Sequence, residues 1–201
     1  MANLLNRSRN RPSALPIAYP LDDFYAQEGR VLPLIQAVQP SEIPEPYHSL
    51  LVHHSDMTPM LTQYHQQSIH LRVLRNQLRD CVLFREVLLI LDEDERPVEF
   101  GAIKINLDLF GSAPCKLIRE NRLPLGQILK DFSISHTSRP KAYLKLKSDE
   151  FINQALNVSG SQTLYGRRNT LSDLRQRPLA EVVEILPLEC THAEPKGSGK
   201  D

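Results

Sequence analysis

Hydrophobic and polar side chains alternate with a period of two in several segments of the chain. These segments are residues 69–73, 98–107 and 179–188, and residues 81–91 and 163–171 are also interpreted as strands. Such alternation is typical of strands that bury one face and expose the other. A short, charged turn at residues 92–97 joins two of the segments, so we expect an antiparallel hairpin there.

A helical period appears between the strand patterns. Residues 47–53 carry it first, and a second helix is expected to begin near Met57, because Asp56 is a good cap and Pro59 is tolerated in a first turn. Residues 124–132 carry a third apolar stripe. Strands in close succession favour one antiparallel sheet, against which helices bury their stripes. The predicted fold is therefore α+β, with a single antiparallel sheet and helices packed on it.

The distribution of prolines along the chain predicts where its domain begins. Residues 1–46 contain seven of the fifteen prolines and are interpreted as a partly extended arm with one short helix near residues 22–26, so regular structure should begin at about residue 46. Residues 47–188 form the predicted domain. Within it, residues 133–161 are harder to assign, and fit a strand around Tyr143 followed by a helix. Residues 189–201 are rich in Gly, Lys and Ser and are predicted to be disordered.

Composition excludes several classes of function. The 201 residues carry 24 basic and 24 acidic side chains, so the basic excess that drives nucleic-acid binding is missing. No apolar run approaches the length of a membrane helix, and no secretory signal is recognisable. The three cysteines form no metal or disulfide pattern, which favours the cytoplasm. Histidine spacing predicts no metal site, and clustered glycines for a nucleotide are missing, so we expect no cofactor.

Two charged residues interrupt apolar rows of the predicted strands. Arg85 shares a face with Leu83 and Val87, and Glu184 lies between Val182 and Leu186. A buried charge costs free energy unless it is paired or used by a ligand. Three interpretations stay open here: the two residues pair with each other, their strands expose that face, or both belong to a functional site.

Two adjacent arginines follow a glycine on a predicted strand. Arg167 and Arg168 must point to opposite faces, so at most one can share a cavity with Arg85. Guanidinium groups bind carboxylates well, which makes this pair a candidate anion site. A solvated strand face is the simpler explanation of the pair.

Four segments, taken in order, resemble the chorismate lyase family, also called chorismate pyruvate-lyase or 4-hydroxybenzoate synthase. They are Ser55-Asp56-Met57-Thr58, Phe84-Arg85-Glu86-Val87-Leu88-Leu89, Leu123-Pro124-Leu125-Gly126, and Gly166-Arg167-Arg168 followed by Arg177-Pro178-Leu179 and Val183-Glu184-Ile185-Leu186-Pro187. The resemblance spans residues 47–188. It departs from the compact members of the family in its proline-rich front, in a longer stretch between residues 129 and 166, and in Phe84, where a tryptophan is familiar.

The resemblance implies a cofactor-free enzyme that converts chorismate to 4-hydroxybenzoate and pyruvate, for quinone or phenolic-lipid synthesis. It implies ligand contacts at Met57, Arg85, Leu125 with the adjoining Gly126, and Glu184. Arg85 would bind a substrate carboxylate and Glu184 the C4 hydroxyl, and these two would be the catalytic residues.

Arg168, or failing it Arg167, is a weaker candidate for the enolpyruvyl carboxylate. The partners implied are chorismate and the two products, and neither a nucleic acid nor a membrane span is expected. The downstream pathway and the oligomeric state stay open.

The same fold also serves as the effector-binding domain of bacterial transcription regulators. A non-catalytic domain that binds or senses an aromatic carboxylate is therefore the alternative. Such regulators carry a winged helix in front, and residues 1–46 are too short and too rich in proline to form one, so the sequence favours the lyase.

Overall fold

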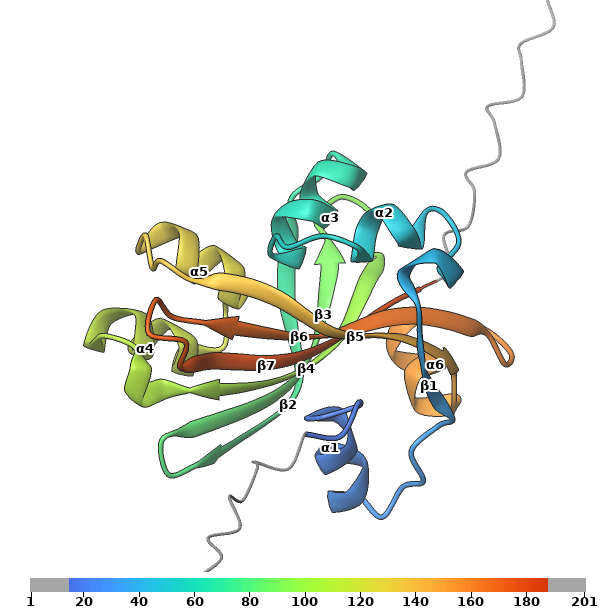
Figure 1. Cartoon of the computed structure of the whole chain (residues 1–201), viewed down its shortest axis with the longest axis horizontal. Coiled ribbons are helices and arrows are strands. Elements are labelled where there is room, and N and C mark those ends of the chain that lie inside the picture. Colours follow the sequence, from blue (N-terminus) through green and yellow to red (C-terminus); the bar gives the residue numbers. More distant parts are fainter. Residues whose placement is uncertain (1–14, 188–201) are drawn as a thin grey trace, which may run out of the picture.

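The computed structural model describes residues 15–187. These residues form one seven-stranded sheet with helices on both faces (Figure 1). The strand order is β1-β5-β6-β7-β4-β3-β2, and every neighbouring pair is antiparallel. The predicted α+β class with a single antiparallel sheet is confirmed. No helix in the described range is long and apolar enough to cross a membrane.

The strands are β1 (Ile35–Val38), β2 (Ile69–Arg79), β3 (Val82–Leu91), β4 (Pro97–Asn106), β5 (Thr137–Lys147), β6 (Thr163–Ser172) and β7 (Pro178–Leu186). The helices are α1 (Leu21–Gln27), α2 (Tyr47–Leu51), α3 (Met57–His65), α4 (Ser112–Glu120), α5 (Leu125–Asp131) and α6 (Glu150–Leu156), with short 3-10 turns η1 (Pro40–Glu42) and η2 (Leu107–Leu109). All predicted strands and helices are present, and β5 and α6 occupy the stretch that was hard to assign. Helix α4 has no counterpart among the predicted elements.

The first part of the chain differs from the expectation. Regular structure begins well before residue 46, because α1 contributes Leu21, Phe24 and Tyr25 to the core and β1 pairs with β5 at the edge of the sheet. The short helix expected near residues 22–26 is confirmed, but it is part of the packed domain. The predicted disordered tail, residues 189–201, lies outside the described range.

Different sets of helices cover the two faces of the sheet. On one face, α1 and α6 pack on a row that includes Phe84, Phe100 and Ile185. On the other face, α4 and α5 cover the half around Ile103, while α2 and α3 cover the half around Leu89. The two clusters on this second face leave a gap between α3 and α5, and the candidate site lies there.

Candidate functional site

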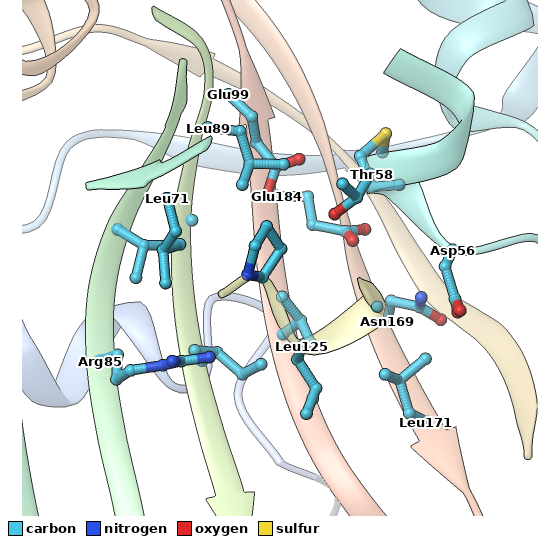
Figure 2. Close-up of a pocket in the computed structure, with 17 residues that line it drawn as sticks. Asp56, Thr58, Leu71, Arg85, Leu89, Glu99, Leu125, Asn169, Leu171 and Glu184 are labelled. Carbon is cyan, nitrogen blue, oxygen red and sulfur yellow. The ribbon is translucent and has the colours of Figure 1, made fainter. Parts of the chain in front are cut away.

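A pocket opens on the second face of the sheet where the first turns of α3 and α5 approach each other (Figure 2). Its lining residues are Asp56, Met57, Thr58, Leu71, Arg85, Val87, Leu89, Glu99, Gly101, Ile103, Pro124, Leu125, Gly126, Asn169, Leu171, Val182 and Glu184. The cavity is about 60 Å³, on a measure by which one water needs roughly 10–15 Å³. A space of this size accepts a small molecule rather than a peptide or nucleic acid.

The floor of the pocket consists of cross-strand rows in register. Arg85 on β3 lies opposite Ile103 on β4, and the next row places Val87, Gly101 and Glu184 side by side on three strands. A Cβ atom on residue 101 would lie 3.1 Å from Val87 Cγ2. Glycine at this position therefore leaves the centre of the floor open.

Arg85 is a buried cation without a carboxylate partner among residues 15–187. It is 1% exposed, and its Nη1 donates a long hydrogen bond of 3.5 Å to Asn121 Oδ1. Arg85 Nε is buried and has no hydrogen-bond partner. Burial alone lowers the pKa of Arg85 to about 10, so the group still carries its charge at neutral pH. An anionic ligand can bind this guanidinium at little further desolvation cost, because the group is already buried.

Glu184 forms an ion pair with Arg167 across β6 and β7, not with Arg85. Arg167 also donates hydrogen bonds to the carbonyl oxygens of Leu51 at 3.2 Å, His53 at 3.1 Å and Ser55 at 3.1 Å. The interpretation in which Arg85 and Glu184 pair with each other is therefore wrong. Arg167 instead ties the segment between α2 and α3 to the sheet and sets the position of Glu184.

The structure corrects the prediction of an anion site at the adjacent Arg167 and Arg168. Arg168 lies on the opposite face of β6 from the pocket, where its Nη1 is 3.9 Å from Glu181 Oε2. Neighbouring residues on a strand alternate between faces, and Arg167 takes the face of the pocket. Arg168 therefore cannot reach a ligand in this pocket. Arg167, the second choice, reaches the site but is already fully engaged with Glu184 and three carbonyl groups.

The remaining sequence-predicted residues lie at two helix starts. Met57 is the first residue of α3 and Leu125 the first residue of α5, and both are buried in the lining of the pocket. A Cβ atom on Gly126 would lie 3.6 Å from both Asp56 Cβ and Thr58 Oγ1. The two helix starts thus pack closely, and the structure brings Met57, Leu125, Gly126, Arg85 and Glu184 together.

Sequence reasoning missed Glu99, a second buried carboxyl group in the pocket. Glu99 precedes Gly101 and Ile103 on the same face of β4, so it interrupts an apolar row in the way that Arg85 and Glu184 do. Burial raises the pKa of Glu99 well above its ordinary value; nearby Glu184 adds to the rise, and Arg167 opposes it. Residue 99 already lies within the predicted strand 98–107, so the same search for charges in apolar rows, applied to that strand, identifies it.

A shallow polar groove adjoins the pocket, with Asp56 lining both. His136 Nε2 lies 3.0 Å from each carboxylate oxygen of Asp56, and His136 Nδ1 lies 2.9 Å from the carbonyl oxygen of Ile134. The hydrogen bond to Asp56 raises the pKa of His136. This pair joins the start of α3 to the segment before β5, at the boundary between groove and pocket.

Metal ligands are not gathered in the described part of the chain. No three His, Cys, Asp or Glu side chains among residues 15–187 lie in an arrangement that would hold an ion. The charged side chains that line the pocket are those of Asp56, Arg85, Glu99 and Glu184.

Neither protein-family models nor curated proteins match this sequence. Several solved structures are similar to this chain in fold. PhnF from Mycobacterium smegmatis matches with a TM-score of 0.50 and 10% identity over 68% of this chain and 65% of that one. The separate effector domain of PhnF matches with a TM-score of 0.50 and 10% identity, over 66% of this chain and 88% of that one.

A third similar structure is the ligand-binding domain of a regulator assigned to the GntR family, from Bordetella bronchiseptica. It has a TM-score of 0.46 and 14% identity over 60% of this chain and 86% of that one. At such identities the likeness establishes the fold alone. The chain has the chorismate lyase-like fold that regulator effector domains also use.

Proposed function

We propose that this protein is a chorismate lyase, which binds chorismate in the pocket beneath α3 and α5 and releases 4-hydroxybenzoate and pyruvate. The observation that carries the proposal is Arg85, a fully buried cation with no acidic partner, lining the same pocket as Glu184. An uncompensated charge of this kind is costly in an empty protein. A carboxylate ligand supplies the missing partner.

The reaction suits a pocket of this composition. The bond between ring carbon C3 and the ether oxygen breaks, the C4 hydrogen leaves as a proton, and the ring becomes aromatic. The departing side chain leaves as the enolate of pyruvate and takes up the proton at its methylene carbon, which becomes the methyl group of pyruvate, so the atoms balance without water or an oxidant. Aromatisation provides the driving force, and the protein contributes positioning and electrostatic stabilisation.

Each lining residue has a role in this proposal. Arg85 binds the ring carboxylate in a charge-assisted fork. Glu184, held in place by Arg167, accepts the hydrogen bond of the C4 hydroxyl. Met57 and Leu125 close the cavity with their side chains and with main-chain groups of the first helical turns.

The alternative is a non-catalytic domain that binds an aromatic carboxylate. The comparisons favour this alternative, because the solved structures of the same fold include effector and ligand-binding domains. The same pocket and the same Arg85 contact serve a sensor equally well. What separates the two functions is turnover, since a sensor binds its ligand and returns it unchanged.

The test is to incubate the purified protein with chorismate, without added metal, and to follow pyruvate and 4-hydroxybenzoate. The lyase proposal expects both products in equal amounts, and Arg85→Ala should lose most of the activity while it stays folded. Binding of 4-hydroxybenzoate without product formation would support the sensor instead. If the folded protein neither binds nor converts these compounds, both proposals fail.

A further inference from the structure

Glu99 is a buried acid that the proposed mechanism does not use. Its side chain is 4% exposed, and its Oε2 atom is buried without a hydrogen-bond partner. The other oxygen, Oε1, lies 3.1 Å from the place that a Cβ atom on residue 101 would take. The carboxyl group therefore reaches over the bare backbone of Gly101 on the pocket floor, toward the centre of the cavity (Figure 2).

The position of Glu99 follows from the strand register. Arg85 lies opposite Ile103, Val87 opposite Gly101, and Leu89 opposite Glu99. Successive rows on one face are about 6.6 Å apart along the strands. Glu184 lies opposite Gly101, in the row between the other two. The pocket therefore has a cationic end at Arg85 and an acidic end at Glu99 and Glu184, with apolar side chains between them.

The two glutamates at the acidic end differ in their environment. Glu184 has an ion pair with Arg167. Glu99 has no such pair, and burial raises its pKa well above the ordinary value, as described above. Two neighbouring carboxyl groups that cannot both ionise take different protonation states. Glu184 is then a hydrogen-bond acceptor and Glu99, as the neutral acid, a donor.

We propose that Glu99 is a specificity-determining residue, which donates a hydrogen bond to the ring hydroxyl of the ligand while the same hydroxyl donates to Glu184. This inference rests on the proposed function and deepens it, because it adds a second contact on the hydroxyl group. A hydroxyl both donates and accepts, so it alone satisfies both glutamates at once. A methyl group in its place leaves the Glu99 acid buried without a hydrogen-bond acceptor, and gives Glu184 no partner beyond Arg167.

The ligand class follows from the two ends of the pocket. A flat or nearly flat ring occupies the apolar middle, with a carboxylate toward Arg85 and a hydroxyl on the opposite side of the ring. Ring acids that carry a methyl group there fit the volume but not the hydrogen bonds. Sites that hydrogen-bond a hydroxyl discriminate strongly against analogues that lack it.

The test compares 4-hydroxybenzoate with 4-methylbenzoate by isothermal titration calorimetry. The unmodified protein should bind the hydroxyl compound at least tenfold more tightly. Glu99→Gln keeps a donor of the same shape and should keep most of this preference. Glu99→Leu removes the donor and should reduce the ratio about tenfold, mainly through weaker binding of 4-hydroxybenzoate.

Glu86→Gln is the matched control, because Glu86 is a buried glutamate on the opposite face of the sheet, paired with Arg75. It should leave the ratio of affinities unchanged. An unchanged ratio in Glu99→Leu, with normal binding by the unmodified protein, overturns the role of Glu99 alone. Failure of the unmodified protein to bind either compound defeats the proposed function itself, and this inference with it.

Infrared spectroscopy tests the same role without relying on the leucine variant. The neutral acid of Glu99 should give a carboxylic-acid carbonyl band that is missing from Glu99→Gln. The band should shift when 4-hydroxybenzoate binds and shift less with 4-methylbenzoate. A band that responds equally to both compounds, or one that persists in Glu99→Gln, contradicts the proposal.

Discussion

Replacing Arg85 by methionine should make the ligand-free protein more stable toward unfolding. Burial lowers the pKa of Arg85 from its ordinary value to about 10, and each unit is worth about 1.4 kcal/mol, so the buried charge costs about 3 kcal/mol. Arginine is charged in both the folded and the unfolded protein at pH 7, so the cost is fully present there. Methionine has a similar length and no charge. After some loss of packing, we expect Arg85→Met to gain about 1–3 kcal/mol of unfolding free energy.

The matched control is Arg167→Met, which removes the other fully buried arginine on the same face. Arg167 has an ion pair with Glu184 and hydrogen bonds to three carbonyl groups. Removing one partner of a buried pair leaves an unpaired charge, so this variant should lose about 3–5 kcal/mol. The two substitutions are chemically identical and should change stability in opposite directions.

Urea unfolding followed by circular dichroism measures both effects as midpoint shifts at a constant slope. The second readout is ligand stabilisation: 4-hydroxybenzoate should raise the melting temperature of the unmodified protein but not that of Arg85→Met. If Arg85→Met loses as much stability as Arg167→Met, Arg85 has a partner in the folded protein. The argument that it awaits a carboxylate is then refuted.

Three further predictions follow from the geometry. Gly101→Ala puts a methyl group into the pocket floor, 3.1 Å from both Glu99 Oε1 and Val87 Cγ2, and should weaken ligand binding about tenfold or more. Calorimetry measures this, and unchanged affinity would mean that the ligand does not lie over this floor. Gly166→Ala places a Cβ atom against the backbone carbonyl of Glu184 and should lower the unfolding free energy by more than about 3 kcal/mol. Urea unfolding measures this loss. A loss below about 1 kcal/mol would contradict the close approach of β6 to β7 at this position. The hydrogen bond to Asp56 raises the pKa of His136, so this pair stabilises the protein fully below pH 6.5 and loses its effect as pH rises through the raised folded value. The stability difference from His136→Gln should shrink between pH 6 and 8, and a constant difference would exclude this linkage.

Much of the architecture could be predicted from the sequence, because strands and helices leave a local signature. Side chains on a strand alternate between faces, so the apolar row around Arg85 identified both the strand and the misplaced charge. The same reasoning identified Glu184. Edge strand β1 could not be predicted in this way, because four residues carry too little pattern and it is the pairing with β5 that makes them a strand.

The partner of each charge could only be decided by the tertiary structure. Arg167 rather than Arg168 faces the pocket, and it pairs with Glu184 because the register of β6 and β7 places these two residues opposite each other. Strand register is a long-range property, set by turns and by the burial of whole faces. The sequence alone therefore identified Arg85 and Glu184 as charges in apolar rows. The register determined that Glu184 is satisfied while Arg85 and Glu99 are left for a ligand.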